Sequence, residues 1–161
     1  MCPASQTEPL AVLLGAGPGA PGLVTAEGVK WLRRADVVIY DKLANPALLA
    51  LAPAAAERVY VGKAPGEHAA SQQQISELLV DRCRPGRVVV RLKGGDPLVF
   101  GRGGEEAEAL AAAAIPFRIV PGVTAAVAAA AFAGIPLTDR RHASTVALVT
   151  GHEDPAKDEP S

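Results

Sequence analysis

Short apolar runs alternate along the chain with longer stretches in which apolar residues recur at helical spacing. The runs are rich in β-branched and aliphatic residues, which is typical of strands buried on both faces of a parallel sheet. They lie at residues 10–14, 37–40, 58–61, 87–92, 117–120 and 145–150. The pattern therefore predicts six strands.

Helices are predicted between these strands, and some of them have recognisable ends. Thr25 is placed to cap a helix that runs to residue 34, and Ser71 is placed to cap one that stops before Pro85. The remaining helices are predicted at 44–51, 105–114 and 124–134. Strands that alternate with helices favour right-handed crossovers. We therefore expect an α/β fold with a mostly parallel, five- to six-stranded sheet and helices on both faces.

The two ends of the chain differ from this alternating region. Residues 151–161 are polar, acidic and contain proline, and such a stretch does not bury enough apolar surface to order itself. We expect a flexible tail over residues 1–9, one domain over residues 10–150, and an interdomain linker over residues 151–161 with no second domain after it.

Composition and charge narrow the class of protein. Of the 161 residues, 49% are hydrophobic and 20% are charged, which is a globular composition. The net charge of -1 argues against bulk binding to nucleic acid or to a membrane surface. Two cysteines are too few for a disulfide scaffold, and the three histidines lack the spacing of metal ligands. With no signal peptide or membrane span predicted, we expect a cytoplasmic protein without a metal.

The first glycine-rich loop, residues 15–22, directly follows the first predicted strand. Its glycine-x-glycine-x-x-glycine spacing fits a dinucleotide fingerprint, so an NAD-dependent dehydrogenase is an open alternative. Pro18 and Pro21 count against that alternative, because proline has no amide hydrogen and a pyrophosphate is bound through amides. A loop without these donors suits a ligand that has no phosphate.

A second glycine-rich loop follows the fourth predicted strand, where parallel sheets place their ligands. Arg91, Lys93 and Arg102 crowd it, which suits a polyanionic substrate. Asp96 is placed to accept hydrogen bonds from ribose hydroxyls or to cap a turn. A long, glycine-dense loop within a compact domain is more often functional than not.

Two further strand ends carry candidate chemistry. Asp41 and Lys63 each follow a strand, and a carboxylate and an ammonium at one rim can act as base and acid. An ordinary salt bridge between them is the alternative. Thr124 begins a helix after a Pro-Gly pair, and a plain helix cap explains it equally well.

Taken together, these segments resemble the tetrapyrrole methylase family, in the same order from about residue 10 to residue 152. The runs Arg-Leu-Lys-Gly-Gly-Asp-Pro at 91–97 and Phe-Gly-Arg-Gly-Gly-Glu-Glu at 100–106 bring the resemblance closest to the uroporphyrinogen-III C-methyltransferases. The remaining matching segments are residues 12–25, 35–41, 61–63, 120–125, 134–138 and 149–152.

The resemblance implies S-adenosyl-methionine as cofactor and the transfer of two methyl groups to a tetrapyrrole, uroporphyrinogen III, giving precorrin-2. It implies that Asp41 is the proton acceptor and Lys63 the proton donor. The cofactor contacts that it implies are Pro18, Gly94, Gly95, Asp96, Val99, Thr124 and Ala125. Arg91, Lys93 and Arg102 are our candidates for binding the carboxylates of the substrate.

The resemblance also implies a homodimer and a second α/β domain that shares the cofactor. We expect these residues to lack that domain, either because they are a fragment or because it is encoded or supplied separately. We therefore expect these residues alone to bind the cofactor weakly and to turn over little. Two more hypotheses stay open: a non-catalytic or truncated methylase domain, and a sister tetrapyrrole methylase that acts on a later corrin intermediate.

Overall fold

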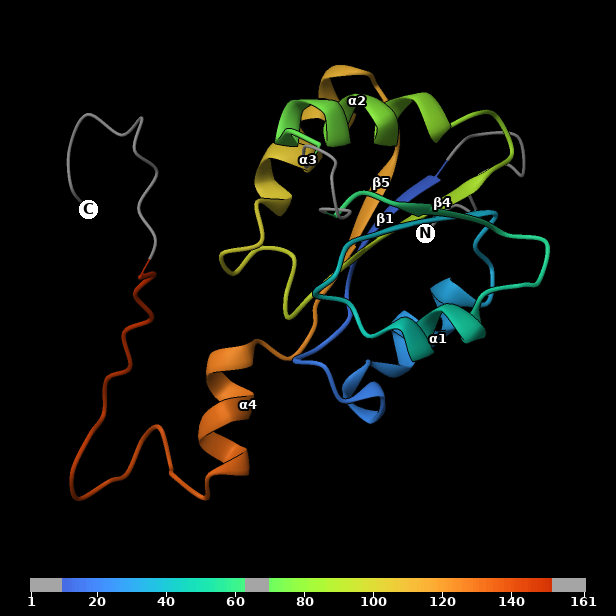
Figure 1. Ribbon diagram of the computed structural model, residues 1–161. Helices are drawn as coiled ribbons and strands as arrows, with labels where there is room; N and C mark the ends of the chain where they lie inside the picture. Colours follow the sequence, from blue (N-terminus) through green and yellow to red (C-terminus); the bar gives the residue numbers. More distant parts are fainter. Residues whose placement is uncertain (1–9, 63–69, 152–161) are drawn as a thin grey trace, which may run out of the picture. The chain divides into compact units, whose positions relative to one another are not determined.

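The computed structural model describes residues 10–62 and 70–151 and contains a five-stranded sheet (Figure 1). Its strands are β1 (Leu10–Gly15), β2 (Val37–Tyr40), β3 (Glu57–Tyr60), β4 (Val88–Lys93) and β5 (Phe117–Val120). They lie in the order β3-β2-β4-β1-β5, and all neighbours are parallel. The predicted α/β fold with a parallel sheet is confirmed.

Helices connect the strands as the sequence pattern predicts. The α-helices are α1 (Ala26–Leu32), α2 (Gln72–Arg82), α3 (Gly103–Ala112) and α4 (Ala125–Phe132). Two short 3-10 helices complete the described elements, η1 (Pro21–Leu23) and η2 (Pro46–Leu51). Thr25 caps α1, because its side chain accepts a hydrogen bond of 3.1 Å from the Gly28 amide.

The sheet is covered on both faces, as Figure 1 shows with α1 on one side and α2 and α3 on the other. On β1, Val12 and Leu14 pack into the cluster that contains residues of α1 and η2. Ala11 and Leu13 point the other way, into the cluster that contains residues of α2 and α3. This alternation follows from the period of two along a strand and explains why the strand is apolar at every position.

Two predicted elements differ from the structure. Residues 145–150 form no strand, and Val149 is 86% exposed. Their β-branched pattern is typical of a strand, but a strand is stabilised by packing and pairing with its neighbours rather than by propensity alone. The helix predicted over residues 44–51 is only the 3-10 helix η2, which Asn45 caps through its contact with the Ala47 amide.

Helix α2 starts at a complete capping box, as the placement of Ser71 predicts. The Ser71 hydroxyl accepts a hydrogen bond of 3.2 Å from the Gln74 amide, and the Gln74 side chain accepts one of 2.8 Å from the Ser71 amide. Two amides that have no partner inside the helix are satisfied in this way.

Replacing Ser71 with alanine is expected to lower the free energy of unfolding by about 1 kcal/mol, because the Gln74 amide loses its acceptor. Urea denaturation followed by circular dichroism measures the change. The matched control is Ser71→Asn, which keeps a capping oxygen and is expected to stay within about 0.5 kcal/mol of the parent. Equal losses for both substitutions would contradict the capping role.

The chain divides into two compact units, Met1–Ala125 and Ala126–Ser161. The sheet and the helices that cover it belong to the first unit, and most of α4 belongs to the second. The predicted tail over residues 1–9 and nearly all of the predicted linker over 151–161 lie outside the described residues. The single domain over residues 10–150 stays a prediction.

Candidate active site

Three glycines bring the loops after β4, β1 and β5 into direct backbone contact at the carboxyl edge of the sheet. A Cβ atom added to Gly15 would lie 2.6 Å from the Gly122 Cα and 2.7 Å from the Gly95 carbonyl oxygen. A Cβ atom on Gly122 would overlap that same oxygen. Only residues without a side chain allow these three loops to approach so closely.

Paired backbone groups lock the first glycine loop against the second. The Gly95 amide donates to the Gly17 carbonyl at 2.8 Å, and the Gly17 amide donates to the Gly95 carbonyl at 3.2 Å. Pro18 therefore directly follows a residue that pairs with Gly95, and the role of both as cofactor contacts stays a prediction. Asn45 secures the far side of the loop, because its amide nitrogen donates to the Gly19 carbonyl at 2.6 Å.

The first loop departs from a dinucleotide fingerprint at its third glycine. In that fingerprint the third glycine allows close packing of helix on strand. A Cβ atom on Gly22 would meet nothing within 4 Å, so no such packing depends on it. Together with the two prolines, this counts against the NAD-dependent alternative.

Asp96 joins the second glycine loop to the loop after β5. Its Oδ2 accepts a hydrogen bond of 3.0 Å from the Gly122 amide, and its Oδ1 accepts one of 2.8 Å from the Leu98 amide. Each carboxylate oxygen can accept a second hydrogen bond, so a ligand hydroxyl can still bind there. Thr124 and Ala125 lie beside Gly95, whose Cβ would be 3.8 Å from the Thr124 Cα and from the Ala125 nitrogen.

A cavity of about 250 Å³ opens next to these loops, and several predicted site residues line it. Its walls include Asp41, Arg91, Lys93, Gly94, Val99 and Arg102. Asp41 follows β2, Arg91 and Lys93 lie on the neighbouring strand β4, and the rest belong to the second glycine loop. The structure thus gathers the predicted base, the three predicted cations and two predicted cofactor contacts around one space.

Arg91 is the centre of a buried network of ion pairs. Its Nη2 donates to the Asp41 Oδ2 at 2.9 Å, and its Nε donates to the Glu106 Oε1 at 3.1 Å. Lys93 donates to the same Glu106 oxygen at 2.8 Å. The Arg91 side chain is 3% exposed and that of Glu106 is not exposed at all, so the pair between these two is shielded from water. The predicted pair of Asp41 and Lys63 is not tested, because Lys63 lies outside the described residues.

Within this network the pKa of Lys93 is shifted, and the two oxygens of Glu106 are bonded unequally. Burial, and secondly the neighbouring Arg91 guanidinium, lower the pKa of the Lys93 ammonium below its ordinary value, while Glu106 opposes the shift. Glu106 accepts three hydrogen bonds on Oε1, the third at 3.2 Å from the side-chain nitrogen Nε2 of Gln72. Its Oε2 is buried and has no hydrogen-bond partner within the described part of the chain.

Arg102 differs from the two buried cations. Its side chain is 58% exposed and forms a bidentate pair with Glu105, at 2.7 and 2.8 Å. Arg102 and Phe100 both have positive φ angles, 55° and 51°, which L residues adopt at a cost. Such strain is common where a loop presents its side chains to a ligand.

Three residues of this site were not predicted from the sequence: Glu106, Gln72 and Asn45. A signal for Glu106 exists, because Gly103, Glu106 and Leu110 share one face of α3 and all three are buried. A carboxylate on the inward face of a helix requires a cationic partner. Gln72 and Asn45 show no comparable signal, since their partners lie 34 and 26 residues away in the sequence.

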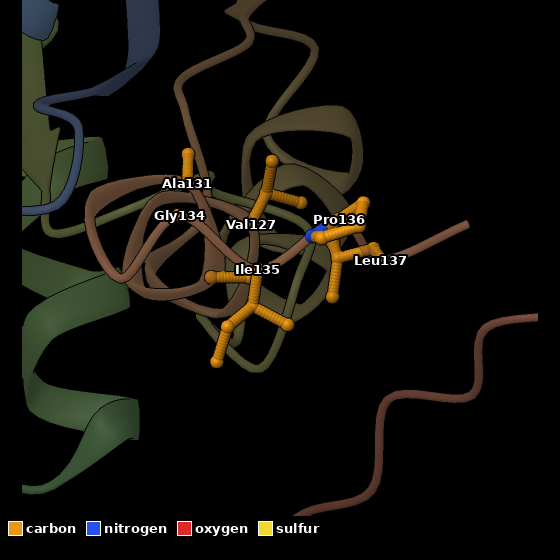
Figure 2. Close-up of a pocket in the computed structure, with 7 residues that line it drawn as sticks. Val127, Ala131, Gly134, Ile135, Pro136 and Leu137 are labelled. Carbon is orange, nitrogen blue, oxygen red and sulfur yellow. The ribbon is translucent and has the colours of Figure 1, made fainter. Parts of the chain in front are cut away.

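The second unit has a groove of a different character. An open groove of about 460 Å³ lies between α4 and the segment that follows it, and Figure 2 shows Val127, Ile135 and Leu137 among its lining side chains. Gly134 ends the helix with a φ of 69° and turns the chain back. The lining is apolar and offers no titratable group, so this groove is not a candidate for the chemistry.

The described residues lack the features of a metal centre and of a membrane span. Within them, no cluster of three or more histidine, cysteine, aspartate or glutamate side chains is arranged to hold a metal ion. The helices in this part of the chain are all too short or too polar to cross a membrane.

Comparison with known proteins gives consistent matches. The family model described as Tetrapyrrole (Corrin/Porphyrin) Methylases matches residues 12–160. The siroheme synthase of Ectopseudomonas mendocina is 57% identical over 140 residues, which are 87% of this chain and 30% of that protein. The S-adenosyl-L-methionine-dependent uroporphyrinogen III methyltransferase of Methanosarcina barkeri is 52% identical over 147 residues, which are 91% of this chain and 58% of that protein.

Solved structures agree with the sequence matches. The uroporphyrin-III-C-methyltransferase of Thermus thermophilus superposes with a TM-score of 0.72 at 48% identity, over 82% of this chain and 55% of that one. A structure of that methyltransferase complexed with S-adenyl homocysteine superposes with a TM-score of 0.70 at 47% identity, over 84% and 56%. The chain therefore spans little more than half the length of these solved relatives, and 30% of the siroheme synthase.

Proposed function

The chain belongs to the tetrapyrrole methylase family, and from that premise we propose that it transfers methyl groups from S-adenosyl-methionine to uroporphyrinogen III. The product after two transfers is precorrin-2. The observation that carries the proposal is the cavity that Asp41, Arg91 and Gly94 share at the carboxyl edge of the sheet. A relative with 52% identity that is named for this activity supports the choice of substrate.

The glycine loops suit a cofactor without phosphate. We propose that S-adenosyl-methionine is bound by Gly94, Gly95, Asp96 and Val99 of the second glycine loop together with Pro18, Thr124 and Ala125 of the two neighbouring loops. The hydrogen bonds between Gly17 and Gly95 and between Asp96 and Gly122 hold these segments together before any ligand binds. Preorganised backbone of this kind lowers the entropy cost of binding.

The cofactor supplies a methyl group that its sulfonium already activates, so the chain needs no covalent nucleophile. The residues of the chain have to align the pyrrole carbon with that methyl group and accept the proton that the macrocycle releases elsewhere once the methyl group is attached. Asp41 is suited to the second task, because its carboxylate lines the cavity and its side chain is 22% exposed. Lys63 is proposed as the proton donor on the strength of the family resemblance.

The carboxylates of uroporphyrinogen III require cationic contacts, and Arg102 is the best placed of the three candidates. Its pair with Glu105 is solvent-exposed, and exposed pairs contribute only about 0–1 kcal/mol, so a substrate carboxylate can replace Glu105 at low cost. Arg91 and Lys93 line the cavity wall, but their charges are already compensated by Asp41 and Glu106. Contacts from these two to the substrate stay a prediction.

The proposal is tested by incubating the protein with S-adenosyl-methionine and uroporphyrinogen III and following the product by mass spectrometry. Two added methyl groups are expected when a second domain is supplied, and little or no transfer by these residues alone. Transfer only to a later corrin intermediate would favour the sister methylases, one of which, a cobalt precorrin-4 methyltransferase, superposes with a TM-score of 0.70 at 37% identity. Cofactor binding without any transfer would favour a non-catalytic domain.

The 161 residues alone are expected to bind S-adenosyl-methionine more weakly than about 10 μM, and to methylate slowly if at all. The reason is that they span 55% of the solved Thermus thermophilus chain, so that other parts of such a chain can contribute contacts. Titration calorimetry measures the affinity, with NAD as the control ligand. Micromolar binding together with full methylation would contradict this expectation, and preferential binding of NAD would contradict the proposed cofactor. We also propose that the whole protein is a homodimer, as the family resemblance implies, and that it acts in the cytoplasm.

A further inference from the structure

Glu106 on α3 is fully buried and shares one carboxylate oxygen between two cations, and the helix itself requires neither feature. Its side chain is 0% exposed, and a single oxygen, Oε1, accepts from Arg91 at 3.1 Å and from Lys93 at 2.8 Å. Replacing a buried ion pair with well-packed apolar residues is often neutral or stabilising. Stability is therefore a weak explanation for a carboxylate at this position. The alternative explanation is an effect of Glu106 on the side chains that it contacts.

The main neighbour, Arg91, is fixed at three points of its guanidinium. Nε donates to Glu106, and Nη1 donates to the Leu92 carbonyl at 3.0 Å. Nη2 then points at Asp41 and donates to its Oδ2 at 2.9 Å. Because the guanidinium is planar and rigid, fixing Nε and Nη1 fixes the direction of Nη2.

The Asp41 carboxylate is held in turn on both of its oxygens. Oδ2 accepts from Arg91, and Oδ1 accepts from the Leu43 amide at 2.9 Å. The side chain keeps 22% exposure and lines the cavity. A chain of contacts thus runs from the buried face of α3 through β4 to the group that we propose as the base.

We propose that Glu106 is a positioning residue, which orients Arg91 and through it the Asp41 carboxylate toward the cavity. This inference rests on the proposed methyl transfer. Lys93 shares the same oxygen of Glu106 and compensates its charge, so that the network can stay ionised in a buried place. Glu106 itself touches neither substrate nor cofactor in this assignment.

The first test compares Glu106→Gln with Glu106→Asp in the full chain. Glutamine keeps the shape and loses the charge, whereas aspartate keeps the charge and is one methylene shorter. Glu106→Gln is expected to lower kcat about 10- to 100-fold, because a misplacement of about 1 Å at the reacting groups can cost about 10²-fold. KM for S-adenosyl-methionine is expected to stay within about twofold, and Glu106→Asp is expected to retain more activity than Glu106→Gln.

A packing role would reverse the order of the two variants, because glutamine fills the space better, and would overturn the proposal. Glu108→Gln is the matched control, since Glu108 is an exposed carboxylate on the same helix. It is expected to leave kcat unchanged.

A double-mutant cycle tests whether Glu106 acts through Asp41. In the Asp41→Asn background, adding Glu106→Gln is expected to change the rate by less than about threefold, because residues that act as a unit are non-additive. Equal losses in both backgrounds would also overturn the proposal.

A measurement without turnover separates this proposal from the proposed function. In NMR spectra of the parent chain, the Arg91 Nε hydrogen is expected to exchange slowly with water, and Glu106→Gln is expected to speed that exchange at least about tenfold and to shift the Asp41 carboxyl resonance. Absence of methyl transfer by the parent even when a second domain is supplied would refute the proposed function and leave this readout intact. An Asp41 resonance that does not move would refute the positioning role, whether or not the parent is active.

Discussion

Asp41→Asn is expected to lower kcat for methyl transfer by about 10²- to 10⁴-fold, the range over which a general base contributes to catalysis. The affinity for S-adenosyl-methionine is expected to stay within about twofold, because the carboxylate lies at the cavity wall beside Arg91 and none of the proposed cofactor contacts bonds to it. Steady-state kinetics and calorimetry on the same preparation measure the two quantities.

The substitution also has a structural cost that has to be separated from its chemical effect. Asparagine presents an NH2 group to one of two donors, the Leu43 amide or the Arg91 guanidinium, so one hydrogen bond is lost. A loss of about 1–3 kcal/mol in the free energy of unfolding is expected. Asp81→Asn is the matched control, because Asp81 is exposed on α2 and its ion pairs within the described residues are with Arg82 and Arg84, away from the cavity. It should leave kcat unchanged.

A rate for Asp41→Asn within threefold of the parent would contradict the role as base. The same result would weaken the proposed positioning role of Glu106, because that role acts through the Asp41 carboxylate. A large loss of kcat accompanied by an equal loss of cofactor affinity would instead indicate that the loop after β2 had moved. The two measurements together therefore distinguish a missing base from a displaced loop.

The strands of the sheet could be predicted because their signal is local. A continuous apolar run such as residues 37–40 needs no knowledge of its neighbours to be read as a buried strand. The run at residues 145–150 has a similar composition and forms no strand, because pairing with a neighbour decides the outcome and composition does not report pairing. The five strands of the sheet were predicted to within one residue at each end, and the sixth predicted strand, at residues 145–150, does not form.

The candidate site could be predicted in part for the same reason. The strand period of two places Arg91 and Lys93 on one face of β4, and the carboxyl end of β2 brings Asp41 beside them. The sequence did not reveal that both cations are paired with carboxylates of the chain itself. Arg91 and Asp41 are 50 residues apart, and Glu106, the carboxylate that Arg91 and Lys93 share, comes from a helix that begins after the loop. Pairings of this kind depend on tertiary structure, so the sequence alone could not predict that Arg91 and Lys93 also form an internal network.

Gly122→Ala is expected to lower the free energy of unfolding by about 1–3 kcal/mol and to weaken the binding of S-adenosyl-methionine at least about tenfold. The added Cβ would overlap the Gly95 carbonyl oxygen and lie 2.8 Å from the Gly15 Cα. Both contacts are backbone atoms, which cannot move aside by changing a rotamer. The loops after β4, β1 and β5 therefore have to separate, and the hydrogen bond of 3.0 Å from Gly122 to Asp96 is strained or lost.

Gly104→Ala is the matched control for stability, because a Cβ there meets nothing within 4 Å and the residue lies in the first turn of α3. It is expected to leave the free energy of unfolding unchanged or to raise it by up to about 1 kcal/mol, since alanine favours the helix more than glycine does. Chemical denaturation and calorimetry on both variants give the comparison. If Gly122→Ala matched Gly104→Ala in stability and bound the cofactor as the parent does, the contact of the three loops would not be what shapes the site, and the cofactor assignment of Gly95, Asp96 and Thr124 would lose its physical basis.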